Sequence, residues 1–147
     1  MQSKQGALYG DDPPVRMWLF GLITLIEMRF LTLIERRFPE DGWQQYLSNK
    51  RLVKAAALQE ERRRRKQDPQ LLDCLQFSDK AQIVIRDEQL RGQIGFQSRR
   101  QAEQAIKNLE KLRNNLAHAQ DIVSLDWGTI VNLSENLERV IEIVTDD

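Results

Sequence analysis

The sequence predicts an all-α protein, an antiparallel bundle of about five helices, and three observations support this fold class. Apolar residues recur at spacings of three and four along long segments, N-capping residues and Pro or Gly turns separate the segments, and the connections are short. The fragment 82–86 contains Ile-Val-Ile and is strand-like, but its neighbours are helical and no second segment pairs with it convincingly.

The first long helix is expected over residues 15–37, after a flexible N-terminal segment over residues 1–14. It ends before Pro39 and the Asp41-Gly42 turn, because proline cannot continue a helix. This helix is apolar nearly all round, which is typical of a helix that is covered on more than one side. A single domain over residues 15–147 has one core, so we expect the second cover to be another subunit in a homodimer.

The next segments are separated by capping residues. A second helical region is expected over residues 43–66, with a break near Ser48-Asn49. Asp68-Pro69 and Ser78-Asp79 each have the residue types that begin a new element, since Asp and Ser cap helices and proline fits the first helical position. Residues 91–97 contain two glycines and are expected to form a connection.

Two helices complete the chain. Ser98 and Gln101 have the spacing of a capping box, and the helix that they open is expected to run to about Ala117. The last helix is expected to begin at Asp126. Its apolar residues share one face: Ile130, Leu133, Leu137, Val140, Ile141 and Val144.

Composition restricts the class of protein. Hydrophobic residues make up 41% and charged residues 30% of 147 residues, as in soluble globular proteins. One cysteine, Cys74, and one histidine provide no disulfide and no conventional metal site, so we expect no metal and no cofactor. The longest apolar run, 17–26, is too short to span a bilayer and has no basic leader before it. These features predict a cytoplasmic protein that does not bind membranes.

The net charge is zero, but the charge is unevenly distributed. Residues 1–66 hold 13 Lys and Arg against 8 Asp and Glu, a net of +5, and the remainder is −5. Much of the excess comes from one basic run: Arg62, Arg63, Arg64, Arg65 and Lys66. The first interpretation of the run is a solvated helix end, where cations interact favourably with the helix dipole. Binding of RNA phosphates is the second.

The helix expected to end near Ala117 carries the residues best suited to chemistry. Its apolar stripe consists of Ala102, Ala105, Ile106, Leu109, Leu112 and Leu116. Arg113 falls four residues after Leu109 and is therefore expected on this core-facing stripe, where a guanidinium must be paired or must border a cavity. Asn114 and His118, the only histidine, lie on the polar side. Roughly 140° separates Arg113 from His118 on an ideal helix, so a second subunit or a helix end is needed to bring them together.

The first helix contains a matching charge. Glu27 lies at three- to four-residue spacing among Ile23, Leu31 and Ile34 and is therefore also expected on an apolar face. Two opposite charges on core-facing stripes predict that Glu27 and Arg113 form an ion pair or face one polar cavity. Glu27 exposed at a gap in the packing is the alternative.

The run Arg113-Asn114-Asn115-Leu116-Ala117-His118 resembles the arginine, four to six residues, histidine motif of HEPN domains. The polar residue after the arginine, the upstream helix with Glu27 and the early Trp127 of the last helix are also similar to that family. The resemblance covers residues 15–143. It implies a helical bundle that dimerises across a two-fold axis, and for many members a metal-independent endoribonuclease of toxin, defence or RNA-processing systems.

The resemblance implies roles for the site residues. His118 transfers a proton, Arg113 holds the scissile phosphate, Asn114 orients either group, and Glu27 fixes Arg113 or stands near the ribose. RNA is then the substrate, and an antitoxin or regulatory protein is a further partner. Three alternatives stay open. The domain can be a non-catalytic HEPN module that binds a nucleotide, RNA or a partner protein. It can be an antitoxin-paired toxin whose target is not RNA. Arg113 and His118 can also serve only as a salt bridge and a helix cap.

Overall fold

The computed structural model of the chain describes residues 13–117 and residue 135. Over this part of the chain there are five α-helices, two short 3-10 helices and no strand, which confirms the predicted all-α helical bundle. The α-helices are α2 (Pro13–Arg37), α3 (Asn49–Arg64), α4 (Phe77–Arg86), α5 (Glu88–Gln93) and α6 (Arg99–Ala117), and the 3-10 helices are η1 (Gly42–Tyr46) and η2 (Leu71–Cys74). The last helix expected from Asp126 lies outside the described residues, as does most of the segment 1–14.

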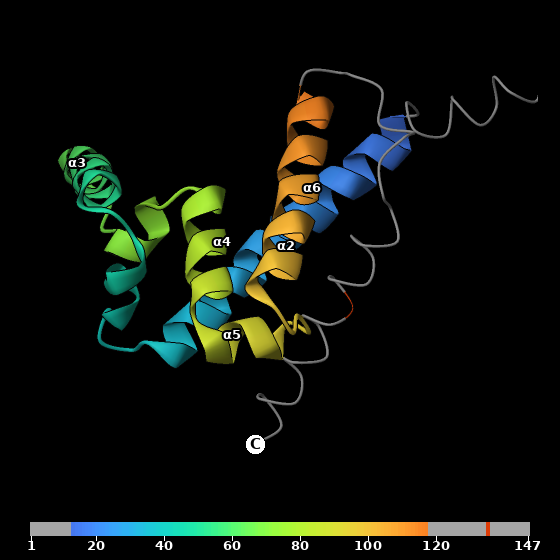
Figure 1. The fold of residues 1–147 in the computed structure, drawn as a ribbon. Coiled ribbons are helices and arrows are strands. Elements are labelled where there is room, and N and C mark those ends of the chain that lie inside the picture. The colour runs from blue at the N-terminus through green and yellow to red at the C-terminus, as the bar shows by residue number, and fades with distance from the viewer. Residues whose placement is uncertain (1–12, 118–134, 136–147) are drawn as a thin grey trace, which may run out of the picture.

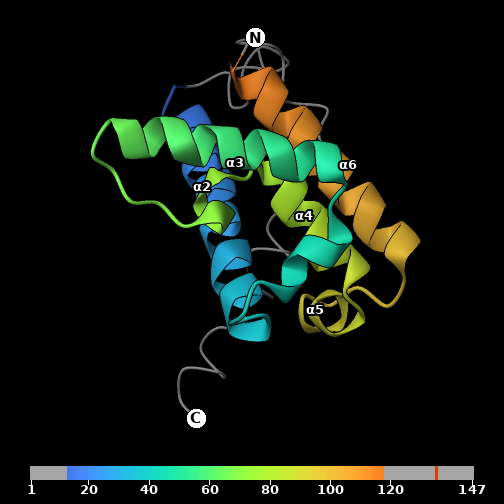
Figure 2. The ribbon, with the colours of Figure 1, turned by 90° about the vertical axis from the view of Figure 1, so that its left-hand side faces the viewer.

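Helices α2, α4 and α6 contact one another and form the centre of the bundle (Figure 1). Helix α6 runs antiparallel to α2, and a hydrogen bond of 3.2 Å from Arg16 Nη2 to the Asn115 carbonyl joins the start of α2 to the end of α6. Helix α3 lies across the outside of this group and contacts mainly η2 (Figure 2). The bundle therefore has an outer helix, α3, which packs mainly on η2 rather than on the three central helices.

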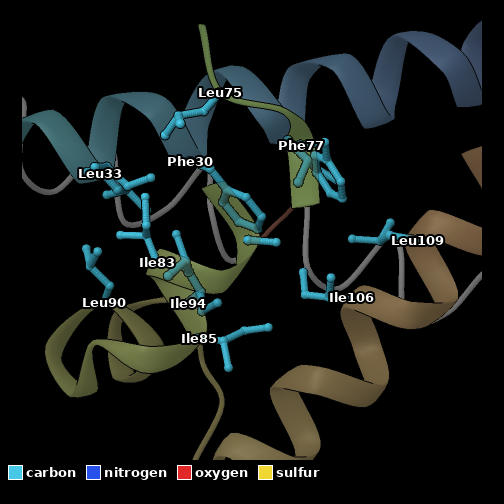
Figure 3. Packing of buried hydrophobic residues seen from close by; sticks show 14 of the residues in the cluster. Phe30, Leu33, Leu75, Phe77, Ile83, Ile85, Leu90, Ile94, Ile106 and Leu109 are labelled. Atoms are coloured by element: carbon cyan, nitrogen blue, oxygen red, sulfur yellow. The ribbon is translucent and has the colours of Figure 1, made fainter. Parts of the chain in front are cut away.

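The core lies between α2, α4, α5 and α6 (Figure 3). Phe30 of α2 stacks on Phe77 of α4 with ring centroids 6.0 Å apart. Helix α2 contributes Leu19, Ile23, Ile26, Phe30, Leu33 and Ile34, all of them buried. The stripe predicted for α6 is buried at Ala102, Ala105, Ile106, Leu109 and Leu112. Burial of this apolar area is the main term that stabilises the bundle.

Several expected boundaries are confirmed. The break in the second helical region falls at Ser48, whose hydroxyl accepts a hydrogen bond from the Arg51 amide at 3.3 Å and caps α3. Ser98 caps α6 in the same way, with 3.1 Å between its hydroxyl and the Gln101 amide. Both caps satisfy an amide that has no partner within its own helix.

Other boundaries differ from the prediction. Helix α4 begins at Phe77 rather than after Ser78, because Asp79 at its third position accepts a hydrogen bond from the Gln76 amide in a capping box. Asp68-Pro69 does not open a helix, since η2 begins at Leu71. Part of the expected connection 91–97 is helical, because Asp87 caps the short helix α5.

Helix α2 buries one face and exposes another that is also apolar. The exposed large residues on this helix are Met17, Trp18, Phe20, Leu25 and Met28. Among the described helices, the stretch Arg16–Arg37 of α2 is long and apolar enough to cross a membrane by length and composition, although 33% of an 18-residue apolar segment within it is buried in the protein. This corrects the interpretation that the apolar segment is too short. The core helix of a soluble protein meets the same criterion.

Candidate functional site

A hollow of about 530 Å³ lies where the ends of α3 and α6 approach the start of α4. Helix α3 forms one wall with Leu58 and Arg62, and α6 forms another with Glu110, Arg113 and Asn114. Glu27 of α2 and a segment from η2 into α4 complete it. That segment contributes Asp73, Cys74, Leu75, Gln76, Phe77 and Ser78. The hollow therefore brings together Arg113, Asn114, Glu27 and the first residue of the basic run.

Arg113 is exposed rather than directed into the core, which corrects the expectation that it lies on the buried stripe. Its guanidinium stands over the ring of Phe77, with 5.9 Å between the guanidinium carbon and the ring centroid. No residue in the described part of the chain forms a hydrogen bond or ion pair with it. The aromatic face stabilises the cation while its N–H groups remain available to an anion.

Glu27 does not pair with Arg113, although both line the same hollow as the sequence predicts for a shared polar cavity. The partner of Glu27 is Lys80 of α4, whose ammonium donates a hydrogen bond of 3.1 Å to the Glu27 carboxylate. Lys80 is 7% exposed, so its charge is compensated by Glu27 away from bulk water. The expected ion pair was wrong because α4 supplies Glu27 with another cation, Lys80, from a more buried position than that of Arg113.

Arg62 is the one residue of the basic run 62–66, all of which the structure describes, that lines the hollow. Its Nη1 donates a long hydrogen bond of 3.4 Å to the Asp73 carbonyl, which leaves most of its donors unused. Residues Arg63, Arg64, Arg65 and Lys66 are exposed, and Arg65 forms an ion pair with Glu61 one turn earlier. The run thus splits into one residue at the hollow and four exposed residues at or just beyond the end of α3.

Helix α3 is held beside the hollow by Arg51. Its guanidinium donates to both carboxylate oxygens of Asp79, at 2.7 and 2.9 Å, and to Gln76 Oε1 at 2.7 Å. The hydrogen bond to Asp79 raises the pKa of Arg51 above its usual value, which favours the charged form of a side chain that is already a permanent cation. Because Gln76 itself lines the hollow, this contact connects α3 directly to the floor of the site.

His118 lies outside the described residues, as does Trp127, so their positions in the site stay predictions. Cys74 is buried and has a free thiol, in keeping with its interpretation as a small core residue. Over residues 13–117, no group of three or more His, Cys, Asp or Glu side chains has the arrangement of a metal site.

Sequence reasoning missed Lys80 and Phe77. Phe77, Lys80 and Val84 are spaced by three and four, so Lys80 is a charge on an apolar stripe, the same signal that singled out Glu27. The signal was hidden because Ser78-Asp79 was interpreted as the cap of this helix, which left Phe77 outside it. Starting the helix at Phe77 makes Lys80 the natural counterpart of Glu27.

Comparison with protein-family models, with curated proteins and with solved structures finds no match to this chain. The likeness to HEPN domains therefore rests on the residues quoted from the sequence and on an all-α fold that is compatible with it. The hollow, with Arg113 and Arg62 on its walls, is the structural feature that bears most directly on function.

Proposed function

We propose that the chain is a metal-independent endoribonuclease of HEPN type, which cleaves RNA through a composite Arg and His site at a homodimer interface. The observation that carries the proposal is the guanidinium of Arg113, unpaired among the described residues and held over Phe77 at the edge of a polar hollow. An arginine in this state can form two parallel hydrogen bonds with a phosphate. Arg62 on the opposite wall offers a second phosphate contact.

The proposed reaction is a transesterification within the RNA strand. The ribose 2′-oxygen attacks the adjacent phosphorus, the bond from phosphorus to the 5′-oxygen breaks, and the products carry a 2′,3′-cyclic phosphate and a 5′-hydroxyl. His118 removes the 2′-hydroxyl proton or protonates the leaving 5′-oxygen, a contribution of about 10²–10⁴ in rate. Arg113 stabilises the charge that develops on the phosphate, and Asn114 orients the phosphate or the histidine.

The proposed homodimer uses the exposed apolar face of α2. Met17, Trp18 and Met28 are 75%, 52% and 59% exposed, which is unusual for three large side chains on one helix of a soluble monomer. Pairing of this face with a second copy removes it from water. It also brings in a second copy of Arg113 and His118, which are separated by roughly 140° on an ideal helix and cannot easily meet within one subunit.

Cleavage of fluorescently labelled single-stranded RNA by the purified chain tests the proposal. Wild type is expected to cut in the presence of EDTA and leave 2′,3′-cyclic phosphate ends, whereas Arg113→Ala and His118→Ala lose activity. Lys111→Ala is the matched control, because Lys111 is an exposed cation on α6 outside the hollow. If wild type cuts no RNA, or the Arg113 and His118 variants cut as well as wild type, the assignment is wrong.

The resemblance also implies a cellular setting. A toxin or defence ribonuclease acts on RNA in the cytoplasm and is held in check by an antitoxin or regulatory protein. Growth arrest on expression, relieved by His118→Ala, is the expected behaviour of such a toxin. Growth that is unaffected by wild-type expression contradicts the toxin role. Cleavage by the purified protein tests the ribonuclease activity independently of that role.

A second function is favoured by the charge of the hollow. Glu27, Asp73 and Glu110 offset Arg62, Arg113 and the nearby Lys80, so the hollow has no strong positive potential. A non-catalytic HEPN module that binds a nucleotide or a partner protein needs no extended basic surface. If wild type binds RNA or a nucleotide without cleaving RNA, and Arg113→Ala loses this binding, the result supports the module over the enzyme.

A further inference from the structure

Lys80 has no role in the proposed chemistry, yet it is a buried cation beside the hollow. Its ammonium lies 3.1 Å from Glu27 Oε1, and Glu27 is its one hydrogen-bond partner among the described residues. The side chain of Lys80 is 9% exposed and that of Glu27 is 26% exposed. Removal of either member of a charge pair in this partly dehydrated position is unfavourable, because the remaining charge is then uncompensated.

Glu27 and Arg113 are placed above neighbouring positions of α4. Lys80 contacts Glu27, and Phe77, one turn earlier in the same helix, lies under the guanidinium of Arg113. Side chains three residues apart on a helix are about 5–6 Å from each other. The carboxylate of Glu27 and the guanidinium of Arg113 therefore border the same hollow beside adjacent turns of α4.

Lys80 is the cation that Glu27 binds in the described part of the chain. With Lys80 present, the carboxylate is neutralised and the N–H groups of Arg113 have no carboxylate partner in the described part of the chain. Without Lys80, Glu27 is an uncompensated anion in a hollow that also holds Arg113. A two-pronged contact between arginine and carboxylate is among the strongest that side chains form, and it occupies the same donors that a phosphate needs.

We propose that Lys80 is a positioning residue for the anion site: by pairing with Glu27, it keeps the guanidinium of Arg113 free for an RNA phosphate. This inference rests on the proposed function in naming RNA as the anion. The state of Arg113 itself is independent of that function and can be measured without RNA.

The first experiment measures the availability of Arg113 directly. The full-length protein is treated with phenylglyoxal, which modifies free guanidinium groups, and the rate at Arg113 is followed by mass spectrometry. Lys80→Met is expected to slow modification of Arg113 several-fold, while Lys80→Met combined with Glu27→Gln restores the wild-type rate. Arg64, exposed on α3, is the internal control and keeps its rate in every variant.

The second experiment measures binding of a 2′-O-methyl single-stranded oligonucleotide, whose blocked 2′-oxygen prevents cleavage. Lys80→Met is expected to weaken binding about tenfold, as expected for the loss of one hydrogen-bonded charge contact. The double variant with Glu27→Gln is expected to return to within about threefold of wild type. Lys107→Met, which removes an exposed cation from α6, serves as the matched control and is expected to bind as wild type does.

The outcomes separate the two proposals. Equal Arg113 modification rates in wild type and Lys80→Met overturn the role of Lys80, as does a double variant that stays slow although it is folded. If Lys80→Met alone does not fold, Glu27→Gln is the reference: Lys80→Met added to it is expected to change neither rate nor binding, and a loss there overturns the proposal. If wild type binds no oligonucleotide but Arg113 shows the expected phenylglyoxal modification in all variants, the ribonuclease proposal is rejected. The role of Lys80 toward Arg113 then still holds.

Discussion

Arg51 and Asp79 form a two-pronged ion pair between α3 and α4, with Nε to Oδ1 at 2.7 Å and Nη2 to Oδ2 at 2.9 Å. Helix α3 buries only Ala55 among its 16 residues, so packing alone holds it weakly. Asp79 is nearly buried and at the same time caps α4 through the Gln76 amide. One carboxylate therefore fixes both the start of α4 and the position of the wall that carries Arg62.

Substitution Arg51→Met is expected to lower the free energy of unfolding by about 1–3 kcal/mol, because it leaves the Asp79 carboxylate without its cation. It is also expected to reduce RNA cleavage beyond the loss of stability, since α3 and Arg62 lose their anchor. Urea unfolding and cleavage of labelled RNA at a temperature where the variant is folded provide the two readings.

Arg65→Met is the control for this prediction. The pair between Arg65 and Glu61 is exposed on both sides, and such pairs contribute about 0–1 kcal/mol. A loss of stability for Arg65→Met as large as that for Arg51→Met contradicts the anchoring role, because both variants remove one arginine from α3 or its end.

A second prediction concerns acid stability. Asp87 caps α5 and is 2% exposed. Burial by itself raises the pKa of Asp87, but hydrogen bonds from the Leu90 amide, from Arg37 and from Tyr46 outweigh it and hold that pKa below its usual value. The ionised carboxylate therefore stabilises the fold at pH values above about 3.9, its pKa in the unfolded chain, and this contribution is lost as the pH falls through the lower folded pKa.

Urea unfolding between pH 2 and pH 6 tests this expectation. Asp87→Asn is expected to be less stable than wild type at pH 6, with the difference shrinking toward pH 2. Tyr46→Phe removes one hydrogen bond of 2.8 Å to the carboxylate and is expected to cost about 1 kcal/mol at pH 6. A difference between wild type and Asp87→Asn that stays constant over this range is incompatible with the lowered pKa.

Much of the described fold follows from local signals in the sequence. The long apolar segment predicts α2, Ser48 and Ser98 predict the starts of α3 and α6, and the spacing from Ala102 to Leu112 predicts the buried face of α6. The start of α4 was misplaced because Ser78-Asp79 has the residue types of a cap. In the folded protein, Asp79 acts from inside the helix and Gln76 is the cap.

The sequence predicted which residues belong to the site better than it predicted which of them contact one another. Periodicity marked Glu27 and Arg113, and both line the hollow, but spacing within one helix gives no information on what a second helix supplies. Lys80 contacts Glu27 from α4, which is separated from α2 in the sequence by α3 and η2. Phe77 lies under the guanidinium of Arg113, an arrangement that depends on how α4 and α6 pack together.

A third prediction concerns the exposed face of α2. Trp18→Glu places a charge on the face proposed for the homodimer and is expected to convert the protein to a monomer and to abolish RNA cleavage. Val53→Glu is the matched control, because Val53 is an apolar residue of similar exposure on α3. Sedimentation velocity measures the mass, and circular dichroism verifies folding. Wild type that is monomeric, or Trp18→Glu that is monomeric and fully active, contradicts the composite site.

The last prediction separates the two parts of the basic run. Arg62→Ala and Arg64→Ala each remove one positive charge, but only Arg62 lines the hollow with Arg113. If a phosphate is held there, Arg62→Ala loses a specific contact, whereas Arg64→Ala changes only the surface of α3. The slope of log affinity against log salt is expected to decrease by roughly 0.7 for Arg62→Ala, the value for one phosphate contact on single-stranded nucleic acid, and to stay unchanged for Arg64→Ala. Equal decreases for both variants mean that the whole run binds RNA diffusely, and the hollow then has no special part in seating the strand.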